Sequence, residues 1–328
     1  MNQENNENKA GDARLDESPT VELYPHNVPS ALVKVDLAAQ SHQGLVRNSN
    51  EDHYLVVQIT RSLETLLTNL AEDALPKSFD ETAYGMMVAD GMGGMAAGEV
   101  ASSVALLKLM ELAIQTPDWT MKMNQREQAT TVMRRMTDRF RKIDDELREQ
   151  GESNRSLHGM GTTLTVVLTL GSEVIVSHIG DSRTYLLRRE KLHQLTKDHT
   201  LAQALVDAGI AKVGDTSTQA MRHVLTAALG STGERDDPQV QRFHLNDGDQ
   251  LLLCTDGLNE MVTDEVIAAV LTSATSSAAA CQELIDLALA AGGRDNITVV
   301  LARYCFPQVG TDLQDRDGAT RKTSSALS

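Results

Sequence analysis

The hydrophobic positions along this chain follow two periods, and the change between them separates expected strands from expected helices. Short apolar or alternating runs, typical of strands, lie at 31–37, 53–59, 84–89, 162–170, 173–179, 184–187, 192–195, 240–245, 250–254 and 297–304. Apolar residues three and four positions apart, typical of helices that pack on one side, lie at 99–114, 123–150, 263–272 and 278–291. Two successive helices with no strand between them indicate a helical layer laid over a sheet.

Three segments add detail to this pattern. The strands between 162 and 195 are expected to form an antiparallel meander, because Gly171-Ser172 and Arg188-Arg189-Glu190-Lys191 are typical turn sequences. Residues 60–82 form an insertion whose leucine-rich first half predicts a helix. That insertion is either a partner-docking element or a surface elaboration. Residues 196–232 form a polar, partly helical excursion.

Composition and charge narrow the classes of partner. The chain has 328 residues, 41% of them hydrophobic, and a net charge of −16 that argues against nucleic acid or an anionic membrane as a partner. Its three scattered cysteines are typical of reduced core thiols rather than of a disulfide framework or a zinc site. No apolar run is long enough to span a membrane. We therefore expect a soluble, cytoplasmic protein.

Acidic residues mark the ends of the expected strands. Glu51-Asp52 precedes a strand, three others end with Asp90-Gly91, Asp181 and Asp256-Gly257, and Asp295-Asn296 opens the last. Because antiparallel neighbours place the start of one strand beside the end of the next, these carboxylates can share one end of a sheet assembly. Two of them 4 Å apart would repel each other by roughly 4 kcal/mol at an effective dielectric near 20. Such a cluster indicates a compensating cation.

The oxygen atoms of these carboxylates indicate which metal ion the cluster would bind and which reaction that ion would support. All-oxygen ligation favours Mg²⁺ or Mn²⁺ over zinc, and two such ions can activate a water for attack on phosphorus. Arg47 lies five residues before Asp52 and has the planar fork that suits bidentate phosphate capture. Taken alone, Asp90-Gly91 also fits an ordinary turn between a strand and a helix.

Six ordered motifs closely resemble the metal-dependent Ser/Thr protein phosphatases of type 2C (the PPM family) in their bacterial form, over roughly residues 34 to 306. They are Arg47-x-x-Asn50-Glu51-Asp52, Asp90-Gly91-Met92-Gly93-Gly94, Gly159-Met160-Gly161-Thr162-Thr163, Gly180-Asp181-Ser182-Arg183, Asp256-Gly257-Leu258 and Asp295-Asn296. The resemblance implies an α+β fold, an α-β-β-α sandwich of two antiparallel sheets flanked by helical pairs. It also implies a phosphatase domain at 31–306, with a mobile flap at 196–232. The polar, non-periodic sequence of residues 1–30 and 307–328 predicts disordered tails.

The resemblance also implies a role for each site residue. Asp90 bridges two metal ions, and the Gly91 carbonyl binds the second. Asp256 and Asp295 hold the first ion, and Glu51 or Asp52 holds the second, one of them through water. Asp181 and Asp256 share a third, weaker metal site, and Arg47 binds the substrate phosphate. The expected cofactors are therefore two Mn²⁺ or Mg²⁺ ions with a third, weaker one.

Two features limit what the resemblance assigns. Many relatives have histidine where this chain has Met92, so the proton for the leaving group comes from metal-bound water or from another residue. The isolated His42 and His178 are interpreted as satisfied structural groups rather than as ligands.

Three functions remain open. The first is a protein phosphatase that hydrolyses phosphoserine and phosphothreonine by direct attack of metal-activated water, as a monomer opposed by a cognate Ser/Thr kinase. The second is a stress-pathway regulator phosphatase with one dedicated substrate. The third is an inactive pseudophosphatase used as a binding module, which the retained carboxylates disfavour.

Overall fold

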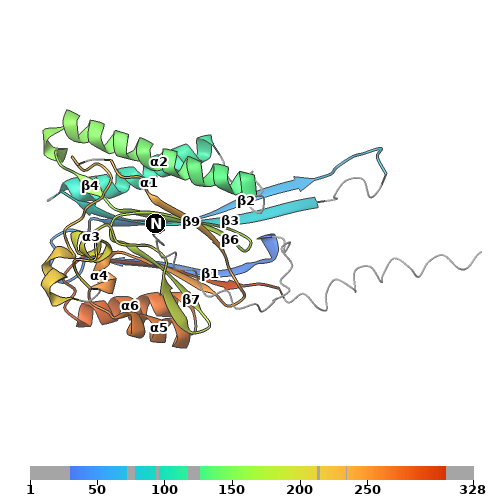
Figure 1. The fold of residues 1–328 in the computed structure, drawn as a ribbon. Coiled ribbons are helices and arrows are strands. Elements are labelled where there is room, and N and C mark those ends of the chain that lie inside the picture. Colours follow the sequence, from blue (N-terminus) through green and yellow to red (C-terminus); the bar gives the residue numbers. More distant parts are fainter. Residues whose placement is uncertain are drawn as a thin grey trace, which may run out of the picture.

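The computed structural model of this chain describes residues 30–71, 78–93, 96–116, 126–212, 215–233 and 235–307. Two antiparallel sheets lie between two pairs of helices, as Figure 1 shows. This arrangement confirms the α+β sandwich that the sequence motifs implied. The tails expected at 1–30 and 307–328 lie outside the described residues except for their innermost positions, Ser30 and Pro307.

The first sheet carries the helical pair formed by α1 (Ala96–Gln115) and α2 (Arg126–Ser153). Its strands run in the order β2 (Asp52–Glu64), β3 (Ser78–Met92), β5 (Leu164–Leu170), β6 (Glu173–Ile179) and β9 (Gln239–His244), with the short β4 (Gly161–Thr162) beside β3. The helix predicted at 123–150 is confirmed in α2, which buries Met136, Phe140, Ile143 and Leu147 on one face.

The second sheet carries the helical pair formed by α5 (Asp264–Ser273) and α6 (Ser277–Ala290). Its strands run in the order β1 (Lys34–His42), β11 (Ile297–Cys305), β10 (Gln250–Cys254), β7 (Arg183–Arg188) and β8 (Lys191–Gln194). The remaining helices are α3 (Leu201–Asp207), α4 (Asp256–Asn259) and 3₁₀ turns at Ser30–Leu32, Arg155–Leu157 and Thr216–Met221. No helix within the described part of the chain is long and apolar enough to cross a membrane.

Strand β3 is buried on both of its faces. Met87 and Ala89 pack against the α1–α2 layer, whereas Met86 and Val88 pack into the core between the two sheets. This double burial explains the continuous apolar run at 84–89, which lacks the alternation of a half-exposed strand. The strand is thereby fixed on both sides up to the residue where the carboxylate motif begins.

The prediction of a helix in the first half of the 60–82 insertion is wrong. β2 and β3 continue their antiparallel pairing through this segment, from Thr60 opposite Thr82 to Glu64 opposite Ser78. The hairpin extends beyond the helical layers in Figure 1. Leu63 belongs to β2, and Leu67 beyond it is 95% exposed. The leucine spacing mimics a helix, but pairing with β3 determines the backbone.

The single meander predicted between 162 and 195 is also wrong. β5 and β6 pair within the first sheet, whereas β7 and β8 form a hairpin at the edge of the second. The chain crosses between the sheets at Gly180, whose φ of +112° favours glycine. A Cβ at this position would also overlap the Thr163 side chain.

His178 lies at the end of β6 and is fully buried, as are both of its hydrogen-bond partners. Its Nε2 donates to the Gly180 carbonyl at 3.0 Å, and its Nδ1 accepts from the Thr165 hydroxyl at 2.8 Å. Burial lowers the pKa of His178 to about 3, and the stacked His199 ring contributes in the same direction. The interpretation of His178 as a structural group is confirmed. His42 is likewise satisfied, because its Nδ1 accepts from the Gly44 amide.

The neutral burial of His178 predicts loss of stability in acid. Between the ordinary histidine pKa near 6.5 and the folded value of about 3, the unfolded chain binds a proton that the folded chain does not. The free energy of unfolding should therefore fall by about 1 kcal/mol from this group between pH 7.5 and 5.5. Denaturant unfolding at several pH values measures this change. The decrease in the free energy of unfolding that comes from His178 should be present in wild type and absent in His178→Gln. Equal slopes would contradict the assignment, and His244→Gln is the exposed control.

Candidate active site

The predicted site residues converge at one end of the sandwich. A cleft of about 850 Å³ is lined by Arg47, Glu51, Asp90, Gly91, Asp181, Asp256 and Asp295. These residues come from five separate segments of the chain, so the fold and not local sequence brings them together. Asp52 is the exception, because it is only 5% exposed and does not line the cleft.

Asp90 is fixed through its backbone rather than through its carboxylate. Its amide donates to the Thr163 hydroxyl at 3.0 Å, and its carbonyl accepts from the Thr163 amide at 2.9 Å and the Thr162 hydroxyl at 2.8 Å. The two threonines of the Gly159–Thr163 motif therefore position Asp90 while leaving its carboxylate free to act. Asp90 also lies directly opposite Asp52 in the β2–β3 register.

Asp52 and the neighbouring Glu51 are held in different ways. Asp52 Oδ2 accepts from the Thr255 hydroxyl at 2.8 Å, which ties β2 to the end of β10. The backbone of Glu51 is bonded on both sides, because its amide donates to Asn296 Oδ1 and its carbonyl accepts from the Ser102 hydroxyl. A Cβ on Gly98 would overlap the Glu51 carboxylate, so the start of α1 passes directly over it.

Asp256 and Asp181 reach the cleft from the second sheet. Asp256 is the first residue of α4, immediately after β10. The following Gly257 has to be glycine, because a Cβ there would overlap the Asn296 carbonyl. Asp181 follows the sheet crossing at Gly180 and is 8% exposed. Asp256 therefore sits where the end of β10 meets the start of β11, and Asp181 sits where the chain passes from the first sheet to the second.

Arg47 lies at the edge of the cleft, where it pairs with Asp295. Its Nη2 donates to Asp295 Oδ2 at 2.5 Å, and the two side chains are 55% and 31% exposed. The ion pair and the flanking carboxylates Asp90 and Asp256 raise the pKa of Arg47, so the guanidinium stays protonated and positively charged. A pair this exposed contributes at most about 1 kcal/mol to folding. The arginine can therefore exchange Asp295 for another anion at low cost.

Sequence reasoning missed the role of Asn296. Its side chain is 5% exposed and makes three hydrogen bonds of 2.8 Å, accepting from the Glu51 amide and donating to the carbonyls of Gln43 and Ser49. Asn296 thus joins the loop that carries Arg47 and Glu51 to the start of β11. Its presence beside Asp295 in one motif was the available signal, but its partners lie about 250 residues away.

Burial and mutual repulsion shift the protonation of these carboxyl groups. Burial raises the pKa of Asp90 well above its usual range, and repulsion from Asp52 and Asp256 adds to it. The same causes raise the pKa of Asp256, where Asp181 is the strongest neighbour. Burial raises the pKa of Asp52 and of Asp181 to about 7. The protein alone therefore stabilises the charged forms of these groups poorly.

The donor set fits hard divalent cations. Within the part of the chain that the structure describes, Asp52 Oδ1 and Asp256 Oδ1 are buried and have no hydrogen-bond partner. An unpaired buried carboxylate oxygen is costly unless a cation or donor meets it. The cleft is lined by carboxylates and by Gly91, and carboxylate and carbonyl oxygens are the ligands preferred by Mg²⁺ and Mn²⁺.

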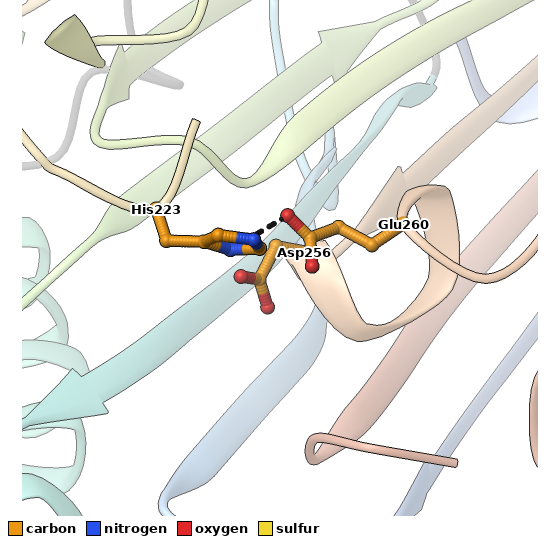
Figure 2. A group of neighbouring side chains, drawn as sticks. All are labelled: His223, Asp256 and Glu260. Carbon is orange, nitrogen blue, oxygen red and sulfur yellow. Dashed lines mark ion pairs between the residues drawn. The ribbon is translucent and has the colours of Figure 1, made fainter. Parts of the chain in front are cut away.

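A further cluster includes two residues that the sequence did not single out. Donor atoms of His223, Asp256 and Glu260 lie within 4.8 Å of one another, and Figure 2 shows the three side chains beside one another, with the ion pair between His223 and Glu260 dashed. Among the described residues, the predicted set of Asp90, Asp256 and Asp295 does not converge as closely.

The sequence matches the family model described as protein phosphatase 2C over residues 69–290. It is 36% identical over 265 residues to the serine/threonine protein phosphatase PstP of Mycobacterium tuberculosis, an alignment that spans 81% of this chain but only 44% of PstP. It is also 35% identical to the serine/threonine phosphatase stp of Listeria monocytogenes, over 69% of this chain and 87% of that protein.

Solved structures agree with these sequence matches. The catalytic domain of PstP in complex with two manganese ions superposes with a TM-score of 0.63 at 34% identity, covering 83% of this chain and 99% of that one. A serine/threonine phosphatase of S. agalactiae superposes with a TM-score of 0.66 at 27% identity. The similarity therefore extends over the whole sandwich.

The raised carboxyl pKa values predict that the metal-free protein loses stability as pH rises. Below the unfolded pKa near 4 the buried groups are neutral in both states, whereas at higher pH only the unfolded chain ionises them freely. The free energy of unfolding should fall as the pH rises above about 4, and less steeply in Asp256→Asn than in wild type. Thermal unfolding in chelator at several pH values measures both slopes.

The control for that series is Asp237→Asn, at an exposed carboxylate paired with Arg141. It should follow the wild-type slope. If Asp256→Asn also followed it, the buried carboxylates would not be the source of the pH dependence.

Proposed function

The chain belongs to the protein phosphatase 2C family, and from that premise we propose that it hydrolyses phosphoserine and phosphothreonine in proteins at a dinuclear Mn²⁺ or Mg²⁺ centre. The observation that carries the proposal is the convergence of carboxylates and one arginine, from five segments, on a single cleft. A surface with no catalytic task would gain nothing from concentrating so many buried like charges.

We assign the metal ligands from the roles that the family motifs imply and from the oxygen donors that line the cleft. Asp90 and the Gly91 carbonyl would bind at the centre of the site, with Asp256 and Asp295 on one side and Glu51 on the other. Asp52, held by Thr255 and excluded from the cleft, would act through water. Asp181 would share a third cation with Asp256. Divalent cations bound there supply Lewis acidity, which makes water a nucleophile near neutral pH and offsets charge on the phosphoryl oxygens.

The protein residues then orient the reacting groups. Thr162 and Thr163 hold the Asp90 backbone, so its carboxylate direction is fixed before substrate arrives. Arg47 binds the phosphate by leaving Asp295, exchanging a single carboxylate hydrogen bond for the bidentate contact that a phosphate allows. Asp295 is then free to bind metal. Met92 lines the cleft but has no proton to give, so another group protonates the leaving oxygen.

Substrates and partners follow from the same proposal. The substrate is a phosphoprotein, opposed by a cognate Ser/Thr kinase, and the catalytic unit is residues 31–306. Free Cys254, Cys281 and Cys305 fit a reducing, cytoplasmic compartment. The alignment with PstP spans less than half of that protein. The proposal therefore names a class of substrate, phosphorylated proteins, and no particular one.

Replacing Asp90 tests the metal assignment. Asp90→Asn should reduce kcat on a phosphothreonine peptide at least roughly a hundredfold, because a ligand worth several kcal/mol to the transition state is lost. Circular dichroism should show an unchanged fold. Folded protein with near-normal turnover would contradict the assignment, and Asp237→Asn serves as the surface control.

Replacing Arg47 tests phosphate binding. Arg47→Ala should raise KM about tenfold with little change in kcat, since a charged hydrogen bond is lost equally from ground and transition states. Arg141→Ala is the matched control, because Arg141 is similarly exposed, at 53%, and also pairs with an aspartate. A loss confined to kcat would be inconsistent with this role.

A further inference from the structure

A chain of hydrogen bonds joins α1 to the backbone of two proposed metal ligands. Ser102 lies near the start of α1 and is fully buried. Its hydroxyl oxygen is 2.6 Å from the Glu51 carbonyl oxygen and 2.9 Å from Nδ1 of His53. The Glu51 carbonyl also accepts from the Gly91 amide, at 3.2 Å. The Glu51 carbonyl is therefore held between Ser102 and the backbone of a second proposed ligand.

The pleat of β2 explains how His53 reaches this chain of hydrogen bonds. Successive side chains of a strand point to opposite faces of the sheet. Asp52 points toward the second sheet, where its carboxylate accepts from Thr255, whereas His53 points toward α1 and Ser102. Neither His53 nor Ser102 is among the described residues that line the cleft. Both therefore act on the site from the helical side, without touching substrate.

The single proton of the Ser102 hydroxyl decides the direction of these bonds. Besides His53, its neighbours are carbonyl oxygens, and that of Glu51 is the nearest at 2.6 Å. The carbonyl oxygens of Gly98 and Glu99 are farther away, at 3.2 Å. The hydroxyl therefore donates to Glu51. Its oxygen then accepts from His53, so Nδ1 of this imidazole carries a proton.

The simpler interpretation is a serine that bonds only within its own helix. Serine and threonine in helices can donate to the carbonyl four residues earlier. Thr272 in α5 does so, with a bond of 2.8 Å to Ala268. The equivalent contact of Ser102, with Gly98, is 3.2 Å and is longer than its bond to Glu51 outside the helix. The hydroxyl is thus directed at the strand that carries the ligand.

The first turn of α1 lies against the same two ligands. A Cβ on Gly98 would overlap the Glu51 carboxylate and would lie 2.8 Å from the Gly91 carbonyl oxygen. The glycine therefore permits α1 to approach both groups closely. Ser102, four residues further along the helix, supplies the hydrogen bond that fixes this approach.

We propose that Ser102 and His53 are positioning residues for the divalent cation bound by Glu51 and Gly91. The inference rests on the proposed metal-dependent function, because it concerns ligands of that centre. His53 donates to Ser102, and Ser102 donates to the Glu51 carbonyl, which also accepts from the Gly91 amide. The backbones of both ligands are thereby held in place. Groups that orient metal ligands contribute roughly tenfold to a hundredfold to metal affinity.

Equilibrium Mn²⁺ binding to the metal-stripped full chain tests the proposal, with free Mn²⁺ followed by electron paramagnetic resonance at pH 7.5. Ser102→Ala should weaken one class of site roughly tenfold or more. The matched control is Ser177→Ala, because Ser177 is also fully buried but its hydroxyl has no hydrogen-bond partner within the described part of the chain. This control should bind Mn²⁺ as wild type does. Wild-type Mn²⁺ affinity in folded Ser102→Ala would overturn the proposal.

Variants of His53 separate positioning from a merely structural role. His53→Ala should weaken the same class of Mn²⁺ site, and His53→Asn should bind more tightly than His53→Ala, because the asparagine amide retains a donor. A structural role alone would lower the free energy of unfolding in chelator and leave Mn²⁺ affinity unchanged. That result in His53→Ala would overturn the role of His53.

The tautomer of His53 provides a readout that needs no variant to fold with full stability. Nitrogen-15 NMR of metal-free, histidine-labelled wild type at about pH 8.5, where an ordinary imidazole is neutral, should show the His53 ring protonated at Nδ1. A ring protonated only at Nε2 would overturn the proposal, because Ser102 would then donate to His53 and not to Glu51.

A parallel phosphatase assay separates this proposal from the proposed function. If wild type releases no phosphate from a phosphothreonine peptide while Ser102→Ala loses Mn²⁺ affinity, the proposed function fails and the positioning role stands. If wild type is active and Ser102→Ala binds Mn²⁺ normally, only the positioning role fails.

Discussion

The structure depends on holding several largely buried carboxylates close together at one end of the sandwich. Their mutual repulsion and burial raise the pKa of Asp90 and Asp256 well above the ordinary range. Apart from the ion pair between Arg47 and Asp295, neutral hydrogen bonds to the backbone hold the cluster in place. Thr163 fixes the Asp90 peptide and Asn296 fixes that of Glu51. The charge on the carboxylates is thereby left for cations, at a cost in stability that the hydrophobic clusters of the sandwich must offset.

The sandwich supplies that offset through strands buried on both faces. β3 packs against helices on one side and against the second sheet on the other, so its end at Asp90 is held rigidly. β10 plays the same part in the second sheet and leads directly into Asp256. Close approach of the start of α4 to the residue before β11 explains the glycine at 257, because a Cβ there would overlap the Asn296 carbonyl. Packing of the cores thus determines the geometry of the cleft.

Much of this arrangement could be predicted from local sequence. Apolar runs located the core strands, and aspartates next to glycines located residues that the fold brings to one cleft. The pairing of distant strands could not be predicted from local sequence. β2 and β3 extend into 60–82, although the leucine spacing there favours a helix. The Arg47–Asp295 ion pair and the contacts of Asn296 join positions about 250 residues apart. His223 and Glu260 are ordinary polar residues until the fold places them beside Asp256.

The most direct test of this account is phosphate release from a phosphothreonine peptide by metal-stripped protein during titration with Mn²⁺ and then Mg²⁺. The account predicts no release without metal, saturable release with it, and none from Asp256→Asn at any metal concentration. Release by the metal-free protein, or equal release by the variant, would contradict a catalytic role for the buried carboxylates. A wild type that binds Mn²⁺ but hydrolyses no phosphopeptide would contradict the proposed reaction itself.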